Sequence, residues 1–176
     1  MYSDVVFNFQ DRVAVVTGAA SGIGEATAQA FAESGASVVV ADIDAAAGWS
    51  VSKELNERGF KSIFVEVDVS SQQATDEMAR AVLNAFGRID FLINNAGIEI
   101  NDSGNIIDMP YDKMKRILDV NLYGAINCAR SIVPIMIEQA VRGDKPGRIV
   151  NISSVHARGA HKPATSYVVS KHGLIG

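Results

Sequence analysis

Short apolar runs alternate with longer amphipathic segments along almost the whole chain, and this alternation limits the possible folds more than any other feature. The apolar runs have the length of strands, and a segment with helical periodicity follows each of them. The predicted strands are Arg12–Thr17, Ser37–Asp42, Lys61–Val67, Ile89–Asn94 and Arg148–Ile152. The predicted helices are Gly22–Ser34, Ala45–Arg58, Ser71–Phe86, about Pro110 to about Ala140, and Ser166 onward.

Strands that are apolar along nearly their whole length are typical of a parallel sheet covered by helices on both faces. Right-handed crossovers then favour an α/β fold with a doubly wound parallel sheet in the strand order 3-2-1-4-5. We expect the fifth strand, Arg148–Ile152, to be a buried one. The chain has no repeat, low-complexity tract or linker, so residues 1–176 are predicted to form a single domain.

Composition argues against several classes of protein. A net charge of −4 and a pI near 5.3 give no reason to expect nucleic acid or an anionic membrane as a partner. The apolar runs are strand-sized, so we predict no membrane span. The N-terminus lacks a basic flank and an apolar signal core, and the single cysteine, Cys128, fits a reducing cytoplasm. No His/Cys cluster has metal-ligand spacing, so no metal site is predicted.

A glycine-rich loop joins the first predicted strand to the first predicted helix. Gly18, Gly22 and Gly24 would let the backbone turn sharply and approach a diphosphate at the helix N-terminus. This context is that of a dinucleotide-binding motif, although a tight turn alone would also use glycines. Asp42 ends the second strand, where it can accept hydrogen bonds from the adenosine ribose and repel a 2′-phosphate, or instead cap the next helix. No lysine or arginine occupies residues 19–23, so NAD is favoured over NADP.

A serine, a tyrosine and a lysine near the end of the chain have the spacing of a proton-transfer site. Tyr167 and Lys171 are four residues apart and leave the same helix face, and Ser154 lies thirteen residues before Tyr167 at a strand end. Tyrosine is a poor base near neutrality, and lowering its pKa of about 10 by roughly three units requires on the order of 4 kcal/mol of anion stabilisation. The Lys171 ammonium and an oxidised nicotinamide are the available cations, while Ser154 would hydrogen-bond the substrate oxygen. The alternative is an ordinary Tyr–Lys pair on a solvated helix face.

Taken together, four motifs resemble the short-chain dehydrogenase/reductase family: Gly18-x3-Gly22-x-Gly24, Asn94-Asn95-Ala96-Gly97, Ser154, and Tyr167-x3-Lys171. The resemblance covers essentially the whole chain and implies a Rossmann-type, cytoplasmic, NAD-dependent oxidoreductase that forms a homodimer or homotetramer. It implies that a secondary alcohol and a carbonyl compound are interconverted, with catalytic roles for Asn121, Ser154, Tyr167 and Lys171. In this family the residue matching Asn121 holds a water behind the lysine; the alternative is a helix-kinking asparagine that bonds its own backbone.

The resemblance also implies which residues contact NAD. Asp68 and Val69 resemble the pair beside the adenine ring, and Asn95 resembles a backbone contact on the adenosine ribose side. Asn94 resembles a residue that steadies the sheet. The predicted cofactor-binding residues are Gly18, Ser21, Gly22, Ile23, Gly24, Asp42, Asp68, Val69, Asn95, Tyr167 and Lys171.

Predicted substrate contacts come from Glu99, Ser154, His156 and Tyr167. The stretches around Glu99 and His156, with the opening Met1-Tyr2-x-Asp4, resemble glucose 1-dehydrogenases of the family. A glutamate and a histidine suit a polyhydroxylated substrate, so a sugar or polyol is favoured. Alternatively, Glu99 caps a loop and His156 is simply exposed. The segment 157–165 does not follow the glucose pattern.

The chain stops at Gly176, where members of the family continue with the rest of the last helix, two later strands and a substrate lid. Without those strands the fifth strand would form an uncovered edge, and without the lid we expect weak turnover or none. A truncated gene prediction, an artificially shortened polypeptide and a natural short form all stay open. A second functional class also stays open: a non-catalytic NAD-binding fragment or subunit.

Overall fold

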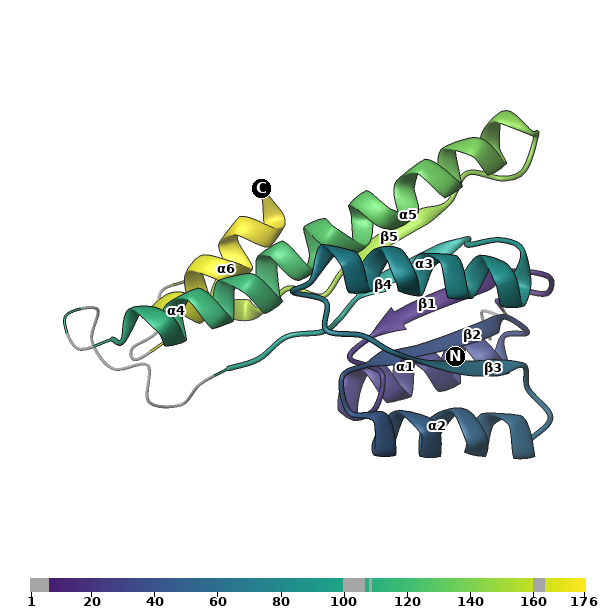
Figure 1. The fold of residues 1–176 in the computed structure, drawn as a ribbon, viewed down its shortest axis with the longest axis horizontal. Coiled ribbons are helices and arrows are strands. Elements are labelled where there is room, and N and C mark those ends of the chain that lie inside the picture. Colours follow the sequence, from purple (N-terminus) through teal and green to yellow (C-terminus); the bar gives the residue numbers. More distant parts are fainter. Residues whose placement is uncertain (1–6, 100–106, 108, 160–163) are drawn as a thin grey trace, which may run out of the picture.

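A five-stranded parallel sheet with the strand order β3-β2-β1-β4-β5 forms the centre of the structure (Figure 1). The computed structural model describes residues 7–99, 107, 109–159 and 164–176. The strands are β1 (Val13–Thr17), β2 (Ser37–Asp42), β3 (Ser62–Glu66), β4 (Phe91–Asn94) and β5 (Arg148–Asn151). The predicted fold class and the predicted strand order are confirmed.

Helices occupy the connections between the strands and cover both faces of the sheet (Figure 1). Helices α3 and α5 pack on one face, and α1 and α2 pack on the other. The helices are α1 (Gly22–Glu33), α2 (Ala45–Glu57), α3 (Gln72–Phe86), α4 (Tyr111–Leu118), α5 (Gly124–Val141) and α6 (Thr165–Ile175). A π-helical turn, η1 (Asp119–Tyr123), joins α4 to α5, and a short 3-10 turn, η2 (Val155–Ala157), precedes α6.

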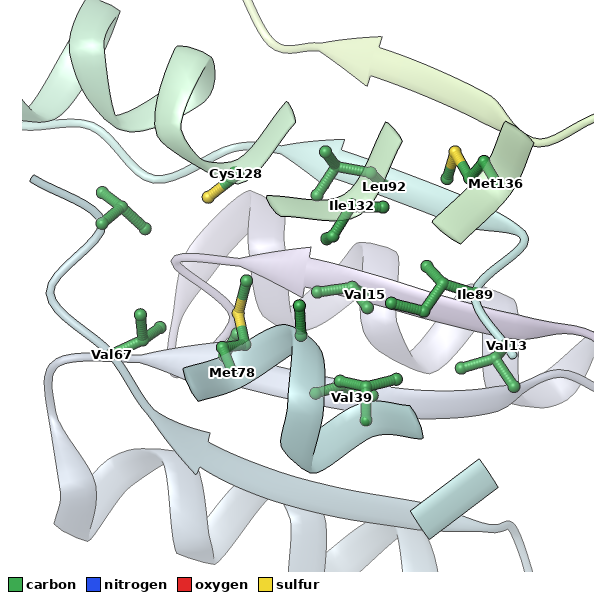
Figure 2. Packing of buried hydrophobic residues seen from close by; sticks show 14 of the residues in the cluster. Val13, Val15, Val39, Val67, Met78, Ile89, Leu92, Cys128, Ile132 and Met136 are labelled. Carbon is green, nitrogen blue, oxygen red and sulfur yellow. The ribbon is translucent and has the colours of Figure 1, made fainter. Parts of the chain in front are cut away.

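The central strand β1 contributes to two separate hydrophobic cores. Val13 and Val15 pack beneath α3 and α5, and Figure 2 shows Val15 between Met78 and Ile132, with Val13 near Ile89. Ala14 and Val16 point to the opposite face and pack beneath α1 and α2. Successive side chains of a strand point to opposite faces, so a strand covered on both sides must be apolar at every position. This explains the continuous apolar runs in the sequence.

The fifth strand is present where predicted, but the prediction that it is buried is wrong. All four residues of β5 are exposed, and the exposed fractions of Ile149 and Val150 are 39% and 49%. The reason is its position, because β5 pairs only with β4 and forms one edge of the sheet. The expectation of an uncovered edge strand is therefore confirmed.

One continuous helical stretch, Tyr111–Val141, is long and apolar enough to cross a membrane if only length and composition are considered. In the structure, however, it supplies Ile117, Cys128 and Ile132, which are almost fully buried. Its second half packs on α3 and on the sheet. We therefore assign this stretch to the core of the domain. The predicted single helix from about Pro110 to about Ala140 is confirmed, apart from the π-helical turn in its middle.

Candidate active site

A groove with a volume of about 420 Å³ lies at the carboxyl ends of the central strands. Loops that follow β1, β2, β3 and β4 line it, together with the start of α1 and one face of α4 and η1. Ligands of doubly wound sheets bind at this edge. The lining residues are Gly18, Ser21, Gly22, Ile23, Ala41, Asp42, Ile43, Val67, Asp68, Val69, Asn95, Ala96, Gly97, Ile98, Arg116 and Val120. Most of the predicted cofactor-binding residues are therefore brought together in one groove.

The glycine loop has a backbone that only glycine adopts easily. Gly18 and Gly22 have φ angles of +65° and +59°, in the left-handed region. Gly24 does not line the groove but lies against the loop, because a Cβ there would be 2.1 Å from the carbonyl oxygen of Gly18. The loop therefore folds back tightly onto the first turn of α1, which lines the groove, and the N-terminus of a helix is a suitable place for an anion.

Replacing Gly24 with alanine is expected to destabilise the domain by about 1–3 kcal/mol, because its Cβ would collide with backbone. The loop must shift to relieve this clash, so NAD⁺ should bind about tenfold more weakly or worse. Thermal unfolding and calorimetric titration with NAD⁺ would measure both effects. Gly159→Ala is the matched control, since a Cβ at Gly159 meets no atom within 4 Å. Equal NAD⁺ affinity in the two variants would contradict this account of the loop.

Two asparagines at the end of β4, Asn94 and Asn95, hold the sheet and the glycine loop in place. The Asn95 side chain donates to the carbonyl oxygens of Thr17 (2.9 Å) and Gly18 (3.1 Å), so it anchors the start of the glycine loop. Its backbone amide donates to Thr17 Oγ1 (3.1 Å). Asn94 instead donates to Asn151 Oδ1 (2.9 Å) and ties β4 to β5. Asn95 therefore lines the groove, but its hydrogen bonds to Thr17 and Gly18 link it to the glycine loop.

Asp42 lies in the groove at the end of β2, and its carboxylate organises two neighbouring turns. One oxygen accepts from the amide of Ala20 in the glycine loop (2.9 Å), and the other accepts from the amide of Asp44 (3.0 Å). Asp42 is not the cap of α2, since Asp44 fills that position and accepts from the amide of Ala47 (3.0 Å). The alternative that Asp42 is a mere helix cap therefore does not describe this structure.

Lys171 reaches a buried position behind the groove. Its Nζ donates to the carbonyl oxygen of Ile152 (2.8 Å) and lies 5.6 Å from the centre of the Tyr167 ring. Only 5% of the residue is exposed, and this burial lowers the pKa of the Lys171 ammonium. The predicted helical pair is therefore real: Tyr167 and Lys171 share one face of α6, and the lysine head group lies beside the tyrosine ring.

Asn121 sits in the π-helical turn η1 and is almost fully buried. Its Oδ1 accepts from the amide of Ile98 (2.7 Å), and its Nδ2 donates to the carbonyl oxygen of Ile98 (2.9 Å) and to Ser170 Oγ (3.2 Å). These bonds reach the β4–α4 connection and α6, so Asn121 does not simply bond its own helix backbone. The wider π-helical turn was not predicted, and such turns are frequent at functional sites.

Gly97 marks the point where the groove meets the lysine and the asparagine. Gly97 lines the groove, and a Cβ at this position would lie 3.4 Å from Asn121 Oδ1 and 3.6 Å from Lys171 Nζ. Tyr167 does not line the groove itself, but its ring lies next to the same lysine head group. The predicted cofactor residues and the predicted catalytic residues therefore form one continuous region.

Ser154 and His156 complete this region on the side of η2. Ser154 Oγ accepts from the amide of His156 (3.2 Å), which leaves its own hydroxyl hydrogen available to a substrate oxygen. The His156 ring meets the Tyr167 ring edge-on, with centroids 5.7 Å apart and an interplanar angle of 87°. His156 is half-buried, so it is not simply exposed. Glu99 is exposed, and the residues Met1 to Asp4 lie outside the described part of the chain.

A family model described as short chain dehydrogenase matches residues 12–176 of this chain. The chain belongs to the short-chain dehydrogenase family. It is 35% identical over 171 residues to the short chain dehydrogenase/reductase astE of Aspergillus oryzae, an alignment that covers 97% of this chain and 64% of that protein. It is 38% identical over 167 residues to (2S)-[(R)-hydroxy(phenyl)methyl]succinyl-CoA dehydrogenase subunit BbsD of Thauera aromatica, covering 95% of this chain and 64% of that protein.

A solved structure supports the same assignment. The short chain dehydrogenase/reductase from Burkholderia phymatum, crystallised in complex with NAD, superposes with a TM-score of 0.90 at 33% sequence identity. The match covers 96% of this chain and 58% of that one. This chain therefore spans between 58% and 64% of the length of these three relatives. The Rossmann-type fold of the chain is the one that this family has.

Cys128 lies in the hydrophobic core and does not line the groove. Burial raises the pKa of the Cys128 thiol to about 12, so the nucleophilic thiolate is scarcely formed. Within residues 7–99, 107, 109–159 and 164–176, no group of three or more His, Cys, Asp or Glu side chains is arranged to hold a metal ion.

Several groove residues were not predicted from the sequence, and Arg116 is the charged one among them. Arg116 on α4 lines the groove and donates to Asp68 Oδ2 (3.3 Å) and to Ser70 Oγ (2.9 Å). Burial by itself raises the pKa of Asp68, but the hydrogen bonds from Ser70 and Arg116 outweigh it and hold this pKa below the ordinary value. Arg116 lies one helical turn before Val120, another groove residue, on the same side of the helical stretch.

Proposed function

We propose that this chain binds NAD and interconverts a secondary alcohol and a carbonyl compound by hydride transfer, with Tyr167 as the acid/base group. The observation that carries the proposal is the position of Gly97, which belongs to the groove and lies against both Asn121 and Lys171. A dinucleotide that fills the groove from Asp42 to Gly97 would bring its far end to the lysine. The family membership and the NAD complex of a relative support the same proposal.

Two features of the groove suit NAD: it offers backbone hydrogen-bond donors, and its glycines let a ligand come close to the backbone. The first-turn amides of α1 would hold the diphosphate, and the left-handed Gly18 and Gly22 leave room for it. Asp42 would accept hydrogen bonds from the adenosine ribose. Bound NAD⁺ supplies the hydride acceptor.

The chain's own residues then handle the substrate and its proton. The Ser154 hydroxyl donates to the substrate oxygen, and Tyr167 takes the proton from the substrate hydroxyl. Lys171, held by the carbonyl of Ile152 beside the Tyr167 ring, provides a cation that stabilises the tyrosine anion. Asn121 fixes Ile98 and Ser170 around the lysine and would steady a water behind it.

The proposed substrate is a sugar or polyol, with other secondary alcohols as the next candidates. His156 beside Tyr167, and Glu99 in the connection that follows β4, would accept and donate hydrogen bonds to several hydroxyl groups. The relative from Thauera aromatica is named for a succinyl-CoA derivative that carries a hydroxyl group, so hydroxyacyl-CoA esters belong among the substrates to be tested.

The test is an assay of NADH formation by the purified chain with NAD⁺ and a panel of sugars, polyols, secondary alcohols and hydroxyacyl-CoA esters. The proposal expects NADH formation with at least one member, and glucose is the first to try. NAD⁺ binding without NADH formation across the panel would instead support the second functional class, a non-catalytic NAD-binding fragment or subunit. Failure to bind NAD⁺ would contradict both.

Preference for NAD over NADP is proposed to depend on the charge of Asp42. Its carboxylate faces the groove where the 2′-phosphate of NADP would lie, so Asp42→Asn should lower the ratio of the NADP⁺ and NAD⁺ dissociation constants by about tenfold, or roughly 1.4 kcal/mol. The ratio is informative because any loosening of the glycine loop affects both cofactors. Asp44→Asn is the control, since it removes a nearby charge and keeps an N-cap residue. The same fall in both variants would exclude a specific role for Asp42.

A homodimer or homotetramer in the cytoplasm is proposed as the working form. Exposed apolar residues on α5 and α6, including Ile126, Ile137 and Val169, support an association of these helices with a second copy. A monomeric mass in light scattering would contradict the oligomer, and fractionation of cells would test the location.

A further inference from the structure

The strand order determines which half of a bound dinucleotide lies at each end of the groove. If the diphosphate of NAD rests at the start of α1, which follows β1, then one half of the dinucleotide must pass Asp42 and extend toward β2 and β3. The other half must extend toward β4 and β5, where Gly97 meets Lys171. The adenine ring therefore belongs near the residues that follow β3, which are Asp68 and Val69.

Arg116 reaches this end of the groove from α4. Its guanidinium donates from one terminal nitrogen to Ser70 Oγ and from the other to Asp68 Oδ2, at 2.9 Å and 3.3 Å. Both acceptors belong to the β3–α3 connection, so the arginine ties α4 to the loop that forms the wall of the groove. The side chain is 45% exposed although both terminal nitrogens are engaged.

These hydrogen bonds use only the edge of the guanidinium group. N–H bonds of a guanidinium lie in its plane, so the two acceptors fix the orientation of that plane and leave its faces unused. A guanidinium that is held in this way on a side chain that is 45% exposed and lines a groove is suited to stack on a flat aromatic ring. The paired carboxylate of Asp68 also offsets the charge of Arg116, so the group does not act as an isolated cation toward a phosphate.

We propose that Arg116 forms one wall of an adenine subsite, with its guanidinium plane fixed by Asp68 and Ser70 and its face stacked on the adenine ring. This inference rests on the proposed binding of NAD but not on turnover. Arg116 is accordingly a positioning residue that contributes to cofactor affinity at the end of the groove remote from the reaction.

The test compares ligands with and without adenine. Dissociation constants for NAD⁺, ADP-ribose and nicotinamide mononucleotide are measured by displacement of fluorescent NADH from the wild-type chain, Arg116→Ala, Arg116→Lys and the control Lys115→Ala. Lys115 is the adjacent α4 residue, exposed and paired with Asp119, and it does not line the groove. Thermal unfolding of each variant shows whether the fold is retained.

Both Arg116 variants should bind NAD⁺ and ADP-ribose about threefold to thirtyfold more weakly, with nicotinamide mononucleotide unchanged and Lys115→Ala like the wild type. Arg116→Lys should not restore the affinity, because a lysine ammonium keeps the positive charge but has no planar group that could stack on adenine. Full affinity in Arg116→Lys, or equal weakening of all three ligands, would overturn the stacking role and leave the proposed function standing. A wild-type chain that binds neither NAD⁺ nor ADP-ribose would overturn both.

Discussion

Replacing Tyr167 with phenylalanine should lower the rate of NADH formation by about 10²–10⁴-fold, the range of general acid–base catalysis, and leave NAD⁺ affinity nearly unchanged. The substitution removes only the hydroxyl group that would take the substrate proton. The ring remains, so its edge-on contact with His156 and the position of Lys171 beside it should be preserved. The effect should therefore appear in kcat, while thermal unfolding stays close to that of the wild type.

The matched control for this variant is Tyr123→Phe. Tyr123 ends the π-helical turn, is 53% exposed and does not line the groove, so loss of its hydroxyl should leave the rate unchanged. A Tyr167→Phe variant with the wild-type rate would show that another group moves the proton. Lys171→Met should lower the rate as well, because it removes the buried ammonium that is proposed to stabilise the tyrosine anion.

Replacing Asp90 with alanine should produce the largest loss of stability, about 3 kcal/mol in the free energy of unfolding. The carboxylate lies at the start of β4, at the opposite end of the sheet from the groove, and only 3% of the residue is exposed. It accepts hydrogen bonds from Arg12 (2.7 Å), from two nitrogens of Arg88 (2.8 Å each) and from the amide of Val13 (2.9 Å). Both arginines are about a quarter exposed, so we place the cost at the lower end of the range for buried pairs.

The same cluster predicts how stability depends on pH. Burial alone raises the pKa of Asp90, but the bonds from Arg88, Arg12 and the Val13 amide outweigh it and hold the pKa below the ordinary value of 3.8. A carboxyl whose pKa is depressed in the folded state contributes stability above its unfolded pKa and loses it as the pH falls through the folded pKa. Below about pH 4 the wild-type chain should therefore lose stability more steeply than Asp90→Asn.

Denaturant unfolding at neutral pH, repeated at several acidic pH values, measures both effects. Asp144→Ala is the control, because Asp144 also pairs with Arg88 but at 3.4 Å on the surface, where such pairs contribute at most about 1 kcal/mol. If Asp90→Ala and Asp144→Ala were equally stable, the buried carboxylate would not be what joins β1 to β4.

Most of the fold could be predicted because its determinants are local. Strands buried on both faces must be apolar throughout, and the helices between them follow from periodicity, so the order 3-2-1-4-5 followed from connection rules. The exposure of β5 could not be predicted from its residues, since Ile149 and Val150 look like core residues. Their exposure depends on whether a further strand or a partner covers that edge, which is not a local property.

The site could be predicted where a motif requires one backbone shape or one helical spacing. The glycine loop and the Tyr167–Lys171 pair are of this kind, and both lie where expected. The hydrogen bonds of Asp42 and Arg116 could not be predicted, because their partners Ala20, Asp68 and Ser70 come from other parts of the chain. The π-helical turn at Asn121 was equally hidden, because it is stabilised by bonds to Ile98 and Ser170 rather than by its own sequence.

The most direct test of the central claim, that groove and catalytic residues form one site, is a crystal structure of the chain with NAD⁺. The account predicts the diphosphate at the start of α1, the adenosine ribose on Asp42, and the nicotinamide beyond Gly97 on the side of Lys171 and Tyr167. A dinucleotide whose nicotinamide points away from Tyr167, or a groove that stays empty at saturating NAD⁺, would contradict the claim.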